Sequence, residues 1–392
     1  MKERIKDLFN LKDIGMGFTF MLVNLASVVA VTSMMGLSIS SALLMTGVNT
    51  ILFFFLTKGK LMSVLGVSGL YTVAVPMITQ KYGIEYTSGA IILAGVLYCI
   101  LGVLVKKCNL LKYIPKYIMS FGVILIGLSL IPIATFLISG NMLVGLFTML
   151  VMIIIEFKCN GLVRLFSLPI SILIGSVVFF MVNGFNLADN LQTMSFIIPK
   201  FNLESFLTVS IIALSVVFEN IGDCKNVGDI LEMDVDKEVG FHNTIIANGI
   251  CSILSGFVGV APATTYSEQS SAILITRYKK NAVVLITAIF FILLSFIKPF
   301  ATLMLTIPNE VLGGSLLFLY GSVVVNAIKQ VLESDIDLAK DRKVFIILST
   351  MIGLFYVTYT VMGLNISSIA ISMVVGILMH NIIKEKEDKK IA

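Results

Sequence analysis

The sequence is poor in charged residues and contains no tryptophan. Of its 392 residues, 13% are charged and 57% are hydrophobic, whereas about 25% of a typical soluble domain is charged. This composition excludes a water-soluble globule. A helix that crosses a bilayer needs about 20 mostly apolar residues, so the chain has room for on the order of a dozen spans. We predict one polytopic, all-α membrane domain.

Residues that bind metals or form disulfides are few and scattered. The five cysteines show no CxxC spacing, and His242 and His380 have no partner at metal-ligand or triad spacing. The sequence also lacks a GxxxxGK[ST] loop, so ATP-driven transport would need a separate subunit. We expect no metal, no cofactor beyond a coupling ion (H⁺ or Na⁺), no nucleic-acid partner and no enzymatic activity.

One acidic run leaves an enzyme as the weakest alternative. Residues 229–238 superficially resemble the aspartate-rich diphosphate sites of membrane prenyltransferases. Their spacing is wrong and they lie between apolar stretches, so we interpret them as a solvated loop. An embedded enzyme would have to require Asp229 or Asp234.

Fourteen apolar stretches are candidate spans. When the N-terminus is placed in the cytoplasm, nearly all Lys and Arg residues fall in cytoplasmic segments, which the positive-inside rule favours. No cleaved signal peptide is evident. We therefore predict a multi-pass protein of the plasma (inner) membrane with both termini in the cytoplasm. The expected spans are 14–34, 38–57, 61–79, 87–105, 114–137, 142–156, 162–182, 205–222, 240–260, 262–276, 281–306, 310–331, 343–361 and 365–383.

A long polar break on the outer side divides the spans into seven and seven. Residues 183–204 form this extracellular loop between a first repeat at 14–182 and a second at 205–383, with cytoplasmic ends at 1–13 and 384–392. An odd number of spans per half forces the halves to be inverted, which is typical of secondary transporters. Such proteins bind substrate near the midplane on interrupted helices.

The third span of each half has the composition of an interrupted helix. Residues 65–76 mix Gly, Ser and Pro with β-branched residues, and residues 259–276 are short and unusually polar. Backbone groups freed in such segments must be buried in protein or line a cavity, because lipid cannot satisfy them. The alternative is that both are short or re-entrant structural helices.

Three acids are the candidate binding residues. Glu219 lies well inside an apolar helix, and Glu268 follows the predicted break in its span. A carboxylate in the hydrocarbon is costly and marks a functional site by default. Asp223 shares a helix face with Glu219, and two close carboxyls cannot easily both ionise, which suits a proton-coupled step. A solvated Asp223 at the helix end and a structural ion pair at Glu219 are the alternatives.

The available side chains favour a neutral planar ligand. Carboxylates would accept N–H groups, while amides at the N-terminus of a half-helix would donate to C=O groups. An anion would need Arg or Lys, and the only cation within a span is Lys298. That residue lies toward the outer end of its helix, where a lysine is expected to snorkel to the interface.

Several blocks in the second half resemble the nucleobase/ascorbate transporter family, also called the uracil/xanthine permease family. They are closest to its uracil permease branch, and the segment at 56–69 resembles the family's lead into span 3. The blocks of the second half are ENIGD (219–223), GFHNTIIANGICSILSGFVG (240–259), APATTYSEQSSAILITR (261–277) and IPNEVLGGSLLFLYG (307–321).

The resemblance implies a fold of 7+7 inverted repeats. Spans 1–4 and 8–11 would form a core domain and spans 5–7 and 12–14 a gate domain, with short β-strands at the interrupted spans 3 and 10. It also implies proton- or Na⁺-coupled nucleobase uptake, often by a homodimer. Glu219 and Glu268 match the family's substrate glutamates, and Ser267 and Gly69 match its backbone contacts. The neighbouring Ser68, Tyr266 and Gln269 complete the expected substrate-binding set.

The sequence departs from the family pattern at several positions. Gln269, Ser270 and Ser271 replace the usual Asn-x-Gly, Asp223 stands where uracil permeases have His, and Gly69 replaces an aromatic residue. The Gln-His pair of span 1 is also absent. We predict uptake of uracil or another oxopyrimidine by proton symport with alternating access, in which Glu219 and Asp223 carry the proton. The alternatives are a xanthine or urate permease and an anion exchanger of related fold.

Overall fold

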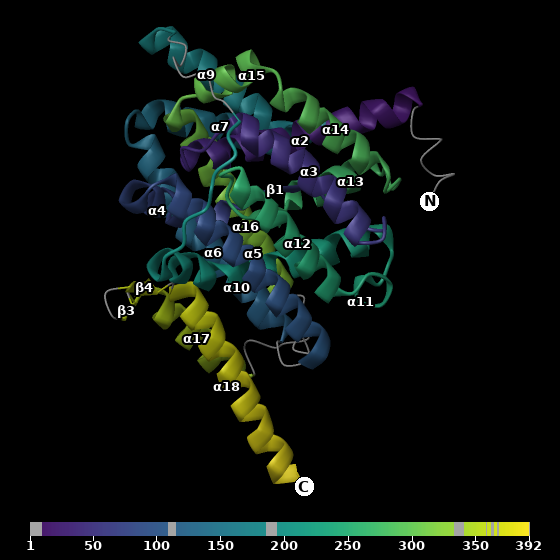
Figure 1. Ribbon diagram of the computed structural model, residues 1–392, viewed down its shortest axis with the longest axis vertical. Helices are drawn as coiled ribbons and strands as arrows, with labels where there is room; N and C mark the ends of the chain where they lie inside the picture. The colour runs from purple at the N-terminus through teal and green to yellow at the C-terminus, as the bar shows by residue number, and fades with distance from the viewer. Residues whose placement is uncertain are drawn as a thin grey trace.

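A computed structural model describes residues 10–108, 115–185, 194–332, 341–357, 359–361, 364–366 and 368–391. The chain folds mainly into helices that pack side by side, and the last helix extends away from the bundle (Figure 1). Parts of two predicted segments, residues 1–9 and 186–193, lie outside the described residues.

The helices follow one another along nearly the whole described chain. They are α2 (Leu11–Met34), α3 (Ile39–Leu56), α4 (Ala74–Tyr82), α5 (Ile84–Cys108), α6 (Lys116–Ile138), α7 (Met142–Lys158), α8 (Leu162–Leu165), α9 (Ser167–Asn183), α10 (Leu203–Leu231), α11 (Val235–Glu238), α12 (Phe241–Phe257), α13 (Ser267–Thr276), α14 (Val283–Ser295), α15 (Lys298–Leu305), α16 (Asn309–Leu332), α17 (Arg342–Phe355) and α18 (Ser368–Ile391). A 3₁₀ helix, η1 (Gly69–Tyr71), precedes α4.

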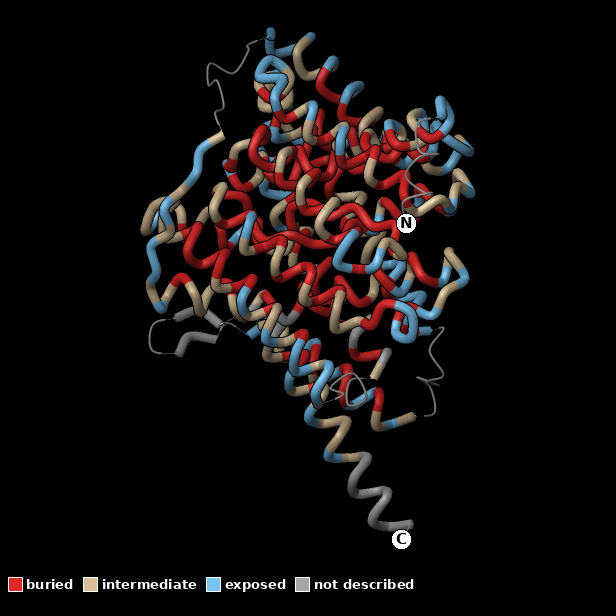
Figure 2. The backbone as a smooth tube through the Cα atoms, turned by 45° about the vertical axis from the view of Figure 1, so that its right-hand side comes forward, coloured by how far each residue is buried: buried red, intermediate tan, exposed pale blue. Residues whose placement is uncertain are grey.

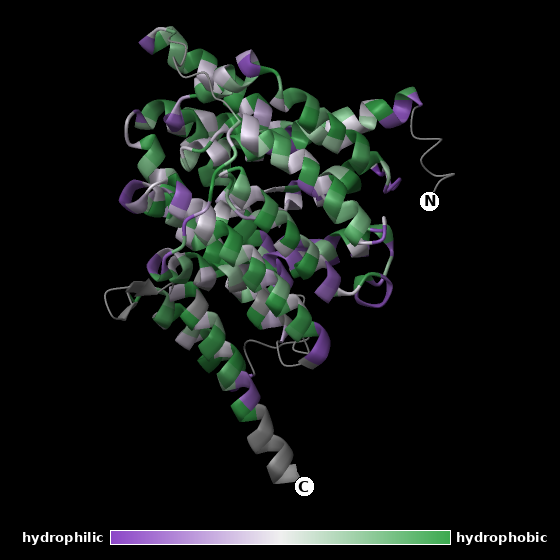
Figure 3. Cartoon of the chain, viewed as in Figure 1, coloured by the Kyte–Doolittle hydropathy of each residue, from purple (hydrophilic) through white to green (hydrophobic). Residues whose placement is uncertain are grey.

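Several helices have the length and composition of membrane spans. Within the described residues, six helices are long and apolar enough to cross a bilayer, and the bent pair α14–α15 makes a seventh if it is one span. Buried residues fill the centre of the bundle (Figure 2), and large apolar side chains such as Leu143 and Phe157 are more than 80% exposed on its periphery. Figure 3 shows hydrophobic residues along most helices. This surface suits lipid, and the count of fourteen spans stays a prediction.

One predicted continuous helix is wrong. The segment at 281–306 bends by 86° between α14 and α15. Pro299 occupies the first turn of α15, where its missing N–H costs nothing, whereas inside a continuous helix it would remove a hydrogen bond. Lys298 therefore begins a new helix at the bend, where it is exposed, rather than lying within a span.

Other helix limits differ from the predicted ones at their ends. Helix α10 begins at Leu203, inside the predicted connecting loop, and continues to Leu231. Helix α18 runs through the predicted tail to Ile391. Within the predicted span at 343–361, the helix α17 ends at Phe355. The strands β3 (Tyr359–Val361) and β4 (Leu364–Ile366) form an antiparallel pair between α17 and α18. Limits of this kind depend on capping, which hydropathy does not report.

Two short strands pair with each other inside the bundle. Strand β1 (Leu65–Val67) pairs antiparallel with β2 (Ala263–Thr265), so that Gly66 lies opposite Thr264. Each strand is also held by the helix before it in the chain. Thr50 Oγ1 of α3 accepts the Leu65 N–H at 3.0 Å, and Ser252 Oγ of α12 accepts the Ala263 N–H at 3.0 Å. Hydroxyls thus satisfy backbone donors that have no water to bind.

Close helix packing holds these strands in place. Helix α5 lies along α12 and α3 lies along α14. A Cβ atom built on Gly95 of α5 would lie 2.7 Å from the carbonyl oxygen of Gly249 in α12, and the converse distance is also 2.7 Å. Only glycine allows this approach, and small residues at helix contacts are typical of membrane bundles.

Candidate functional site

The two strands lead into two helices that begin near the same point. After β1 the chain enters η1 at Gly69, and after β2 it enters α13 at Ser267. The Tyr266 hydroxyl donates to the Val67 carbonyl at 3.0 Å, across the strand pair. A Cβ on Gly66 would lie 2.2 Å from the Tyr266 ring, so this position requires glycine. The paired strands thus fix where both helices begin.

Glu219 and Asp223 lie one turn apart on α10 and meet consecutive residues of β2. The Thr264 hydroxyl donates to Glu219 Oε2 at 3.0 Å, and the Thr265 hydroxyl donates to Asp223 Oδ2 at 2.9 Å. Both acids are half-buried. Asp223 is therefore held against the strand, which argues against a freely solvated residue at a helix end.

Glu268 meets a helix that the sequence did not connect with the site. It lies in the first turn of α13, and the Ser27 hydroxyl of α2 donates to its Oε1 at 2.5 Å. One turn earlier on α2, Asn24 Nδ2 donates to Gln269 Oε1 at 2.9 Å. Ser27 and Asn24 are small neutral residues in an apolar stretch, and no sequence signal distinguished them from helix filler.

The three carboxyl groups influence one another electrostatically. Glu268 acts on Glu219, and both act on Asp223. No Lys or Arg in the described part of the chain forms an ion pair with any of them, since the ion pairs there involve other acids. A structural ion pair at Glu219 is thus not observed. A cluster of acceptors without a cation suits a neutral N–H donor better than an anion.

The remaining predicted residues surround the same region, and their accessibility differs. Tyr266 and Gln269 are buried, whereas Ser267 is exposed. The backbone N–H of Ser68 donates to the Pro262 carbonyl at 2.9 Å, so it is not free for a ligand. The Ser68 hydroxyl is buried and has no hydrogen-bond partner among the described residues. At Gly69, a Cβ would meet only Val31, at 3.8 Å, which leaves space beside that residue.

No sequence signal pointed to three tyrosine hydroxyls that interact with the acids. The hydroxyls of Tyr71 and Tyr98 lie 2.6 Å apart, and both residues are buried. Both interact electrostatically with Glu219. Tyr320 of α16 interacts electrostatically with Glu268, and its buried hydroxyl has no hydrogen-bond partner in the part of the chain that the structure describes. Tyrosines are spread through this sequence, and composition alone did not separate these from core residues.

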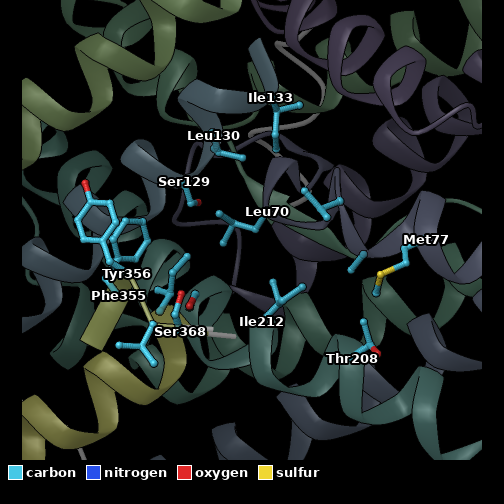
Figure 4. A pocket seen from close by; sticks show the side chains of 15 residues that line it. Leu70, Met77, Ser129, Leu130, Ile133, Thr208, Ile212, Phe355, Tyr356 and Ser368 are labelled. Carbon is cyan, nitrogen blue, oxygen red and sulfur yellow. The ribbon is translucent and has the colours of Figure 1, made fainter. Parts of the chain in front are cut away.

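A cavity of about 340 Å³ lies between one wall of η1, α4 and α10 and another of α6, α17 and α18 (Figure 4). Neither Glu219 nor Glu268 lines it, although Ser215 and Leu70 lie close to predicted site residues along the chain. Its lining residues are Leu70, Val73, Ala74, Met77, Ser129, Leu130, Ile133, Thr208, Ile212, Ser215, Phe355, Tyr356, Val357, Ser368 and Ile369.

Comparisons with known proteins find a family model and curated relatives that cover most of the chain. A model of the Permease family matches residues 11–362. The chain is 26% identical to the probable uracil permease of Haemophilus influenzae, over 97% of this chain and 96% of that protein. It is 28% identical to the uracil permease of Escherichia coli K12, over 88% and 85% of the two chains.

The fold has solved counterparts among more distant transporters. The transmembrane domain of the cyanobacterial bicarbonate transporter BicA superposes with a TM-score of 0.66 at 14% identity, over 95% of this chain and 97% of that domain. At this identity the likeness concerns the fold alone. The Permease family match and the apolar helices together show an integral membrane protein.

Proposed function

Because the chain belongs to the uracil/xanthine permease family, we propose that it is a secondary transporter for a nucleobase, most simply uracil or a related oxopyrimidine. The two named relatives, a probable uracil permease and a uracil permease, align with this chain over most of their length. The observation that carries the proposal is the pair of glutamates on α10 and α13, each held by a hydroxyl and neither paired with a cation among the described residues.

The two glutamates are suited to a pyrimidine with two ring N–H groups. Glu219 has one oxygen bound to Thr264 and Glu268 has one oxygen bound to Ser27. Each carboxylate therefore retains acceptor capacity for a ligand donor. Charge-assisted hydrogen bonds from ring N–H groups to carboxylates are stronger than neutral ones, so the base would be gripped from two opposing helices.

Proton symport is the proposed coupling mode, with Na⁺ as the alternative ion. Asp223 lies one turn from Glu219 on the same helix face, and both are held by neighbouring hydroxyls of β2. Two neighbouring acids in a low-dielectric site can hold a proton between them as the base binds. Release of the base and the proton on the other side would complete the cycle.

The packing of the helices supports a fold of two inverted halves with fourteen spans. Helix α3 packs on α14, as α12 packs on α5, and α2 packs on α14, as α10 packs on α5. When the first half is superposed in thought on the second, each of these helix pairs corresponds to the other of its kind. The contact of Thr50 with β1 corresponds in the same way to the contact of Ser252 with β2. A core domain that moves against a gate domain would provide alternating access.

Ion pairs support the proposed orientation in the plasma membrane. Lys60–Glu238, Lys279–Glu232 and Lys280–Asp13 link segments that the charge pattern places in the cytoplasm. The hydrogen bond from Lys279 lowers the pKa of the Glu232 carboxyl below its usual value, so this acid stays ionised near neutral pH. The lipid bilayer and a second copy of the chain, as a homodimer, are the proposed partners.

Uptake by purified protein in liposomes tests the function. With an inward proton gradient, radiolabelled uracil should accumulate, and a proton ionophore should abolish the accumulation. Absence of uptake and of binding for every base in a panel of uracil, thymine, xanthine, urate and hypoxanthine would refute the proposal.

A purine permease is the second candidate, because the space beside Gly69 could admit a second ring. Stronger competition by xanthine or urate than by uracil would favour it. An anion exchanger is supported only by the fold, and inhibition by bicarbonate or sulfate with no effect of bases would favour that reading.

A further inference from the structure

The cavity is lined by the face of α10 that also carries Glu219. Thr208, Ile212 and Ser215 line it and are spaced by four and three residues. Continuing the same stripe by four residues gives Glu219. A helix rises 1.5 Å per residue, so Glu219 is about 6 Å along the axis from Ser215. The cavity therefore extends outward from the position of the first glutamate.

The part of the same wall that η1 and α4 form also leads toward predicted site residues. Leu70, Val73, Ala74 and Met77 line the cavity from η1 and α4, and Leu70 directly follows Gly69. A Cβ at position 69 would have one described atom within 4 Å, Val31 Cγ2 at 3.8 Å, so there is room for a ligand beside this residue. Figure 4 shows Leu70 at the centre of the lining, with Met77 and Thr208 at one end and Phe355 and Tyr356 at the other.

The lining has the chemistry of an apolar pocket. None of its 15 residues is charged. The hydroxyls of Ser129 and Thr208 donate to carbonyls of their own helices, so these two groups offer no free proton. Aliphatic side chains, Met77 and Phe355 supply most of the remaining surface. A neutral apolar group would gain from burial here, whereas a charge would lose its hydration without a partner.

We infer that this cavity is a side pocket for an apolar substituent on the transported base. The inference rests on the proposed function. When the N1–H and N3–H groups of a pyrimidine are bound by Glu219 and Glu268, the C5–C6 edge is free to carry a substituent. The volume of about 340 Å³ lies at the lower end of the range of about 300–1,000 Å³ typical of ligand pockets. The substrate class thus extends to alkylated oxopyrimidines.

A homologous series of ligands tests the side pocket. Binding of uracil and of its 5- and 6-methyl, ethyl, propyl and butyl derivatives to the purified protein would be measured by calorimetry. At one of the two ring positions, each added methylene group should strengthen binding about three- to fourfold until the pocket is full. 5-Carboxyuracil should bind at least about tenfold more weakly than 5-ethyluracil, because no cation lines the cavity to compensate for the lost hydration of its carboxylate.

Variants on α10 connect that series to the cavity. Ile212→Phe should lower the affinity of the best alkyl derivative relative to uracil by about tenfold or more, and Ile212→Ala should move the optimum to a longer chain. Leu207→Phe is the matched control, because Leu207 lies on α10 outside the lining, and it should leave the affinity ratio unchanged.

The outcomes separate this inference from the proposed function. If uracil binds and the alkyl series is flat or falls at both positions, the side pocket is overturned, and a lipid or detergent chain is the better occupant. An affinity ratio that responds equally to Ile212→Phe and Leu207→Phe would also overturn it. If uracil and the other bases of the panel do not bind at all, the proposed function itself fails.

Discussion

The Ser27 hydroxyl of the first described helix donates to Glu268 at 2.5 Å, although 241 residues separate the two in the sequence. This contact and the neighbouring one between Asn24 and Gln269 attach α2 to the beginning of α13. One oxygen of Glu268 is thereby occupied, and the direction of the carboxylate is set. Ser27 is a positioning residue in the proposed site, since it acts on the base through Glu268.

Removing the Ser27 hydroxyl should weaken base binding. A hydrogen bond to a charged group contributes about 1.5–3 kcal/mol, so Ser27→Ala should raise KM for the base by about tenfold or more. The maximal uptake rate should change less, because the acids that carry the proton remain. Ser27→Thr keeps the hydroxyl and should restore most of the affinity. Equal KM values for Ser27→Ala and the wild type in liposome uptake would remove this role.

Glu219→Gln should abolish proton-driven accumulation of the base. The amide has nearly the shape of the acid but cannot exchange a proton. It also replaces one acceptor oxygen with an NH₂ donor, which would oppose an N–H group of the ligand. Asp236→Asn is the control, because Asp236 is an exposed acid in the segment after α10. It should accumulate base like the wild type. Accumulation by Glu219→Gln at the wild-type level would contradict the assignment.

The contact between α5 and α12 predicts a stability difference between two glycines. Gly95→Ala would force a Cβ against the Gly249 carbonyl, and such overpacking costs about 1–3 kcal/mol. Gly321→Ala lies in a helix with no heavy atom within 4 Å of the added Cβ, so it should be neutral or slightly stabilising. Thermal unfolding in detergent measures both. A lower midpoint for Gly321→Ala than for Gly95→Ala would be inconsistent with this packing.

Adjacent lysines after α13 should differ in the same assay. Lys280 lies 2.5 Å from Asp13, whose side chain is 0% exposed and also accepts from the Tyr278 hydroxyl. Lys280→Met leaves a buried acid without its cation, so a clear loss of stability is expected. Lys279 pairs with Glu232, whose side chain is 82% exposed, so Lys279→Met should have little effect. Equal midpoints for the two variants would contradict the buried pair.

The sequence already indicated much of the fold and part of the site. Long apolar runs identify spans because hydrocarbon offers the backbone no hydrogen-bond partners, and α2, α3, α5, α6, α10 and α16 lie where such runs predicted helices. Glu219 and Glu268 were found because a carboxylate in an apolar run is costly and therefore conspicuous. The bend at Pro299 was missed because a proline near a span end is also compatible with an uninterrupted helix.

Composition and local pattern therefore determined a membrane transporter with acids in or next to its apolar runs, since both follow from the cost of polar groups in lipid. Only the tertiary structure decided which groups hold those acids. Ser27, Thr264 and Thr265 are neutral and small, and their importance comes from partners in distant segments. The strand pairing of β1 with β2 and the cavity beside α10 likewise depend on contacts between the two halves. Hydropathy reports only whether a segment prefers lipid or water, whereas these features arise from contacts between segments that are distant in the sequence.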